Sequence, residues 1–84
     1  MKLYAIEVCD ARWEETMGGF EYVVPDDCKI SAITTVSRLE QALRMIISDD
    51  ERIKQIIELF EKREELKHCT DFDCIVIHPI FLVL

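Results

Sequence analysis

The C-terminal stretch DFDCIVIHPIFLVL, residues 71–84, constrains the fold of this chain more than any other segment. Its apolar run from Ile75 is interrupted only by His78 and Pro79. The run is too short to cross a bilayer, because a spanning helix needs about 20 apolar residues. We therefore predict a strand, and Pro79 predicts a bulge or an edge position within it.

Both faces of this predicted strand are apolar. A strand covered on one face would alternate between apolar and polar residues, whereas this one needs cover on both. Two helices can cover one face of a small sheet, so we expect a loop, a second copy or a partner on the other. One face would carry Ile75, Ile77, Phe81 and Val83, and the other Val76, Ile80, Leu82 and Leu84.

Alternation predicts an N-terminal hairpin. Leu3–Val8 and Phe20–Val24 alternate and are rich in strand-forming residues. Gly18-Gly19 suits the turn between them, because glycine tolerates positive φ. Pro25-Asp26-Asp27 predicts the end of the second strand. Residues 28–36 alternate as well, which leaves a short third strand open.

Two capping signals predict two consecutive helices. Ser37 and Glu40 form a capping-box pattern, and Ser48-Asp49-Asp50-Glu51 repeats the signal. We expect the second helix to run for about 18 residues and to project beyond the core. Met45 lies outside the apolar stripe of the first helix. The predicted buried residues are Leu39, Ala42, Leu43, Ile46 and Ile47 in the first helix and Ile53, Ile56, Ile57, Leu59 and Phe60 in the second.

These elements predict a single α+β domain over residues 1–84. A small antiparallel sheet would contain the hairpin, the C-terminal strand and, if residues 28–36 form one, a short third strand. The two helices would pack together on one face of this sheet.

Charge and cysteine usage limit the partners that we expect. Seventeen acidic against ten basic residues give a net charge of −7, which disfavours direct binding to nucleic acid or to an anionic membrane. We therefore expect a protein target, and the acidic charge favours a target with a basic surface. The first residues do not resemble a secretion signal, so we expect a cytoplasmic protein whose four cysteines are reduced thiols.

The sequence contains no catalytic or nucleotide-binding motif, and we predict no enzymatic activity, no catalytic residue and no cofactor. An alternative assigns a general-base role to His78, which would need a nearby carboxylate or nucleophile. A Cys9–Cys28 disulfide lacks a supporting C-x-x-C spacing. A zinc site is a further alternative that the spacing disfavours. Its ligands would be His68, Cys69, Cys74 and His78.

The hairpin loop is the predicted binding surface, because Trp13 and Met17 stand there among acids. In the alternative interpretation, the loop folds back and the Trp13 indole covers the edge of the core. The predicted partner-binding residues are Trp13, Glu14, Glu15, Met17, Glu21, Asp26, Asp27, Glu58, Glu61 and Glu65. A homodimer would use Ile80, Phe81, Leu82, Val83 and Leu84.

The function that we expect is non-enzymatic binding to a protein target, as an inhibitor or an adaptor. Small acidic proteins of this profile are common among phage and mobile-element proteins that block host defence. One alternative is a self-assembling oligomer with a shared pocket for a small ligand. The other is a DNA mimic, although Lys54 and Lys62 relieve the acidic face of the second helix.

Overall fold

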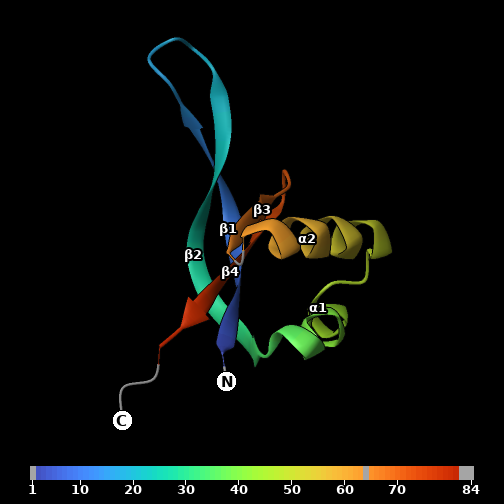
Figure 1. The fold of residues 1–84 in the computed structure, drawn as a ribbon. Helices are drawn as coiled ribbons and strands as arrows, with labels where there is room; N and C mark the ends of the chain where they lie inside the picture. The colour runs from blue at the N-terminus through green and yellow to red at the C-terminus, as the bar shows by residue number, and fades with distance from the viewer. Residues whose placement is uncertain (1, 64, 82–84) are drawn as a thin grey trace.

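One antiparallel sheet carries both helices on one of its faces (Figure 1). The structure is a computed structural model that describes residues 2–63 and 65–81. The strand order is β2-β1-β4-β3, so the first and last strands of the chain are the two central ones. The predicted α+β fold is confirmed. In chain order the elements are β1 (Leu3–Glu15), β2 (Glu21–Thr34), the 3-10 turn η1 (Val36–Arg38), α1 (Leu39–Ile46), α2 (Asp50–Arg63), β3 (Leu66–Cys69) and β4 (Asp73–Ile80).

The core lies between the helices and one face of the sheet. Ile6 of β1 stands directly opposite Ile77 of β4, and both side chains are fully buried. Tyr4 and Ile75 lie on the same face, because side chains two positions apart along a strand point the same way. Burying a side chain of this size stabilises the fold by about 1.5–3 kcal/mol. The buried cluster consists of Tyr4, Ile6, Leu39, Leu43, Ile53, Ile56, Phe60, Leu66, Ile75 and Ile77.

Strand β4 confirms that the C-terminal stretch is extended and has two apolar faces. Ile75 and Ile77 face the helices and are buried. Val76 and Ile80 lie on the opposite face and are only partly covered. Phe81 was predicted to share the face of Ile75, but it follows the end of the strand and is 83% exposed.

Pro79 lies beyond the part of β4 that pairs with β3. That pairing runs from Cys74 to Ile77, whereas β1 pairs with β4 as far as Ile80. A residue without an N–H is tolerated where no strand needs its donor. The position of Pro79 therefore fits the predicted edge-like environment.

Strand β2 continues through Pro25-Asp26-Asp27, so the predicted break is wrong. The pairing of β1 with β2 shifts between Val8 and Asp10, and Asp27 takes a positive φ of 51°. Such a bulge accommodates an extra residue without ending the strand. The proline is tolerated because β2 is an edge strand. Residues 28–34 are thus the second half of β2 and not a separate third strand.

The tip of the hairpin confirms the predicted glycine turn. Thr16 N–H donates to the Phe20 carbonyl at 2.8 Å, and Gly19 N–H donates to the Thr16 carbonyl at 3.0 Å. Gly19 has a φ of 84°, a conformation that most other residues adopt only with strain.

The predicted capping box at the start of α1 does not form. Ser37 lies within η1, and its hydroxyl is 3.1 Å from the Thr35 hydroxyl. Arg38 precedes α1 and makes no capping hydrogen bond through its side chain. The 3-10 turn takes the place of the first helical turn that the pattern predicted.

Helix α2 begins with the predicted cap but ends early. Asp49 Oδ1 accepts hydrogen bonds from the N–H groups of Glu51 at 3.0 Å and Arg52 at 3.3 Å. The helix stops at Arg63 after 14 residues and does not project as predicted. The chain then reverses, and Leu66–Cys69 pairs with β4 as β3, an element that the sequence did not predict.

The buried faces of the two helices largely agree with the predicted stripes. Leu59 is an exception, because it is exposed one position before the buried Phe60. Met45 is exposed as predicted. Neither helix of the described chain has the length and hydrophobicity that a membrane span requires. The fully confirmed buried positions are Leu39, Leu43, Ile53, Ile56 and Phe60.

The Tyr4 hydroxyl is a polar group inside the apolar core. Its ring packs edge-on against Phe60, with centroids 4.9 Å apart and an interplanar angle of 83°. The side chain is 1% exposed, and its hydroxyl has no hydrogen-bond partner among the described residues. A buried hydroxyl without a partner costs stability.

We predict that Tyr4→Phe leaves the free energy of unfolding unchanged or raises it by up to about 1 kcal/mol, because only the unpaired hydroxyl is removed. Tyr4→Leu should lower it by more than about 1 kcal/mol, because the aromatic pair is lost. Urea unfolding of the three proteins measures both effects. A marked loss of stability in Tyr4→Phe would contradict an unpaired hydroxyl.

Candidate protein-binding surface

The β1–β2 hairpin extends well beyond the four-stranded sheet (Figure 1). Strand β4 pairs with β1 from Leu3 to Asp10, whereas β1 continues to Glu15 with β2 as its described neighbour. We call residues 11–25 the hairpin arm. Two-stranded ribbons lack a core of their own, so the side chains of the arm stay largely accessible.

One side of the arm is apolar from its base to Trp13 and acidic beyond it, where Glu15 stands opposite Glu21. Trp13 stands opposite Val23, and Ala11 stands opposite Pro25. Trp13 is 50% exposed and lies outside the buried cluster. The alternative in which its indole covers the edge of the core is therefore wrong. An indole held on a strand offers a rigid apolar contact at low entropic cost.

The other side of the arm is polar and internally bonded. Arg12 Nη2 lies 2.6 Å from Glu14 Oε1, and the Tyr22 hydroxyl donates to Glu14 Oε2 at 3.0 Å. This hydrogen bond and the charge of Glu14 raise the pKa of Tyr22. These contacts fix side chains along an otherwise open ribbon.

The tip of the arm adds two exposed apolar residues. Met17 is fully exposed, and Phe20 is 76% exposed. Sequence reasoning did not single out Phe20 or Tyr22, because their alternation with Val24 suggested a covered strand face. The two residues are exposed because the hairpin outruns the sheet, and the alternation itself carries no sign of that.

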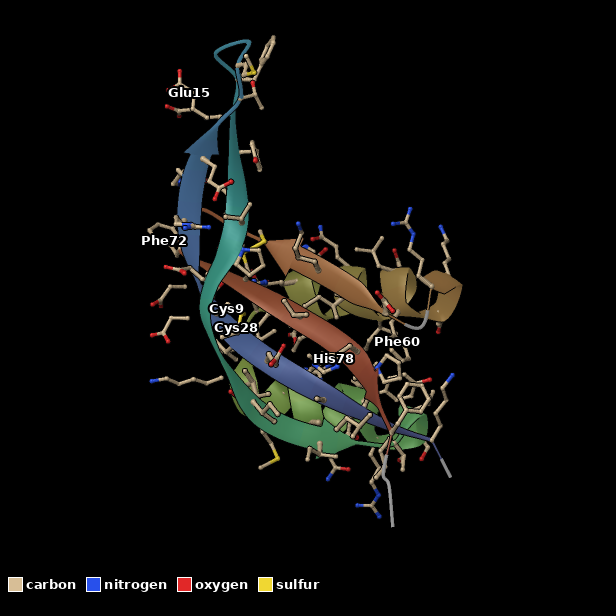
Figure 2. The ribbon with its side chains drawn as sticks, turned by 90° about the vertical axis from the view of Figure 1, so that its left-hand side faces the viewer. Cys9, Glu15, Cys28, Phe60, Phe72 and His78 are labelled. Atoms are coloured by element: carbon tan, nitrogen blue, oxygen red, sulfur yellow. A yellow bond between two sulfur atoms is a disulfide. The ribbon has the colours of Figure 1, made fainter. Side chains whose placement is uncertain are left out.

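Acidic residues stand opposite each other at two levels of the hairpin. Glu15 pairs with Glu21 near the tip, and Asp10 pairs with Asp26 at the base (Figure 2 labels Glu15). Like charges directly across a strand pair are destabilising. The hairpin thus carries electrostatic repulsion that a cationic partner would relieve. Asp27, also predicted to bind a partner, lies exposed in the bulge next to the base.

The predicted acids of the second helix lie elsewhere. Glu58 and Glu61 are exposed on α2, whereas Glu65 follows the end of the helix. Figure 1 shows the arm pointing away from the helical layer. The predicted partner-binding residues therefore divide between two separate surfaces.

The four alternative zinc ligands do not converge. Cys69 and Cys74 form a disulfide. His68 is held by α2, and His78 lies on the other face of the sheet, with Nε2 3.3 Å from Glu7 Oε2. Within the described residues, no three His, Cys, Asp or Glu side chains are grouped to hold a metal ion. His78 does gain the nearby carboxylate that a general base would need.

Arg52 ties α2 to the β3–β4 turn. Its Nη1 lies 2.7 Å from Asp73 Oδ1, and its Nη2 donates to the His68 carbonyl at 3.2 Å. Its Nε donates to His68 Nδ1 at 3.3 Å, and His68 Nε2 lies 3.2 Å from Gln55 Oε1. This arrangement requires a neutral ring, with Nδ1 accepting and Nε2 donating. Burial and the positive charge of Arg52 lower the pKa of His68.

We predict that protonation of His68 destabilises the fold. Because its folded-state pKa is lowered from 6.5, its contribution is fully present above that pH and is lost as the pH falls through the folded-state value. A His78→Gln variant leaves His68 as the remaining histidine. The urea concentration at its unfolding midpoint should decrease when the pH is lowered from about 7.5 to about 5.5. In the double variant His68→Gln/His78→Gln this decrease in the midpoint should be smaller. Equal decreases in both variants would contradict the assignment of the effect to protonation of His68.

Within residues 2–63 and 65–81, no helix or further strand covers the sheet face turned away from the helices (Figure 2). Ile30 and Ile33 of β2 are each 58% exposed on it. The contact between Glu7 and His78 lies among these apolar side chains. We call this surface the open face. The described residues that form it include Leu3, Ala5, Glu7, Cys9, Ile30, Ile33, Val76, His78 and Ile80.

All four cysteines are paired, so the prediction of reduced thiols is wrong. Cys9 is bonded to Cys28, and Cys69 is bonded to Cys74. The Cα atoms are 4.1 Å apart in each pair. The bulge in β2 brings Cys28 beside Cys9, and β3 brings Cys69 opposite Cys74. Both features were missed from the sequence, which explains why the pairing was missed as well.

Comparison with known protein families, curated proteins and solved structures found no match to this chain.

Proposed function

We propose that the protein is a non-enzymatic binding module, an inhibitor or adaptor, and that its hairpin arm contacts a protein target. The main support is the exposure of Trp13, Met17 and Phe20 on a ribbon that stands clear of the sheet. Exposed aromatic and methionine side chains are enriched where proteins bind one another.

The opposed acids support a target with a basic surface. Each like-charge pair on the hairpin lowers stability in the free protein. A cationic side chain placed between Glu15 and Glu21, or between Asp10 and Asp26, would turn repulsion into attraction. Binding would then remove the repulsion between the opposed carboxylates that is present in the free protein. An acidic module of this kind suits the phage or mobile-element type of inhibitor.

The alternative of DNA mimicry has weaker support. Its acids would have to form one continuous surface, whereas those of the arm and those of α2 lie apart. Lys54 and Lys62 also interrupt the acids of α2. A cytoplasmic location stays a prediction, and the two disulfides do not favour it, because the cytosol keeps most thiols reduced.

We predict that variants of the arm weaken capture of the target from lysate of the native host. Trp13→Ala should lose about 2 kcal/mol of binding free energy, roughly 30-fold in Kd. Met17→Ala should weaken binding as well, whereas Met45→Ala, an exposed methionine on α1, should not. Equal capture by all three variants would refute the role of the arm.

The acids give a second comparison within the same experiment. Glu15→Gln should weaken binding and yet raise the free energy of unfolding slightly, because it relieves a like-charge pair. Glu61→Gln on α2 is the matched control and should leave binding unchanged. Opposite signs for stability and binding would distinguish a functional acid from a structural one.

A second candidate function is self-assembly through the open face. A hollow of about 480 Å³ adjoins this face, lined in part by Lys67, Val76 and His78, and a second copy could close it around a small ligand. Strand β4 is paired on both sides from Cys74 to Ile77, so its face and not its backbone edge would form this contact. The predicted interface residues Leu82, Val83 and Leu84 lie outside the described residues.

We predict that, if the open face mediates self-assembly, the wild-type protein sediments as a dimer at high concentration and Ile33→Lys as a monomer. A charge on this face would be buried without a partner in the dimer. Leu59→Lys, at an exposed position of α2, is the control and should still dimerise. A wild-type protein that is monomeric at all concentrations would exclude this function.

A further inference from the structure

Each of the four strands contributes one cysteine to a single row across the open face. The two disulfides join Cys28 of β2 to Cys9 of β1, and Cys74 of β4 to Cys69 of β3. Cys9 and Cys74 are themselves directly opposite in the pairing of β1 with β4. Figure 2 labels Cys9 and Cys28 at one end of this row. In spatial order the cysteine row is Cys28, Cys9, Cys74 and Cys69.

The two inner cysteines therefore each have two neighbours that could be bonded to them. Directly opposed residues of an antiparallel pair have Cβ atoms about 4.5–5.5 Å apart and point to the same face. A disulfide needs about 3.5–4.5 Å between Cβ atoms, so a small adjustment lets Cys9 reach Cys74. Both inner cysteines are buried, at 2% and 0% exposure, whereas Cys28 is exposed. An external thiol can thus approach the row at its β2 end.

We propose that the cysteine row is a thiol–disulfide exchange device in which Cys9 changes its partner from Cys28 to Cys74. A small dithiol attacks Cys28 Sγ, and Cys9 leaves as a thiolate. The second thiol of the dithiol then releases Cys28 as a thiol and closes the reagent into its own disulfide. Cys9 attacks Cys74 Sγ, the Cys69–Cys74 bond breaks, and Cys69 leaves as a thiolate that takes up a proton.

The net reaction transfers two electrons from the dithiol to the protein. Two disulfides become one, and Cys28 and Cys69 become thiols. The starting form ties both edge strands to the centre of the sheet, whereas the product ties only the two central strands together. Cys9–Cys28 stands at the base of the hairpin arm, so its loss removes the covalent link between β1 and β2 there and leaves their pairing. The exchange does not depend on what the arm binds.

Two single variants test the exchange without any added oxidant or net reduction. In Cys69→Ser, the thiol of Cys74 stands opposite Cys9 and can displace Cys28 from it. In Cys74→Ser, the thiol of Cys69 is separated from Cys9 by the whole of β4. After incubation at mildly alkaline pH, acid quenching, alkylation and peptide mapping, we expect a Cys9–Cys74 bond in a share of Cys69→Ser molecules. We expect only Cys9–Cys28 in Cys74→Ser.

A mirror pair keeps the test valid if one variant fails to fold, which circular dichroism would reveal. Cys28→Ser leaves the Cys9 thiol beside Cys74 and should also form Cys9–Cys74, whereas Cys9→Ser should retain only Cys69–Cys74. In the wild-type protein titrated with dithiol, Cys9–Cys74 should be the main single bond. The proposal is overturned if folded variants keep only their original bond, or if bonds between chains form in its place.

Discussion

The pairing of β1 on both of its sides determines how the rest of the molecule is arranged. From Tyr4 to Asp10 this strand lies between β2 and β4, and the helices pack on the face that results. Beyond Asp10 the same strand continues with β2 as its described neighbour, and the sheet becomes a ribbon. One uninterrupted strand therefore supplies both the centre of the core and the most exposed part of the structure. The core anchors the ribbon, and the ribbon presents side chains that no core requires.

The fold could be predicted where one local pattern dominates. The C-terminal strand, the glycine turn at Gly19 and the cap at Asp49 each follow from a few neighbouring residues. The errors arise where a tertiary contact outweighs a local preference. Pro25 is accommodated because β2 is at the edge, and β3 replaces the end of α2 because Leu66 is buried opposite Ile77. Neither the edge nor the opposing strand is visible in a local window.

The candidate site was predicted only in part, for a related reason. The sequence pointed to Trp13 and Met17 as unusual residues in a polar stretch, and both are exposed. It could not indicate that Phe20 joins them, because exposure on the arm depends on where β4 stops. The disulfides depend on register between strands far apart in the sequence, which cysteine spacing alone does not reveal. Local composition indicated part of the exposed surface of the arm, and the remaining residues could be assigned to it only from the sheet topology.

The position of Trp13 has a practical consequence for optical work. It is the single tryptophan of the chain and lies on the arm, outside the buried cluster. The fluorescence of Trp13 therefore reports on the surroundings of the arm and is largely insensitive to the packing of the core. A titration with a ligand can use this intrinsic fluorophore without an attached dye. Unfolding of the core has to be followed by far-ultraviolet circular dichroism instead.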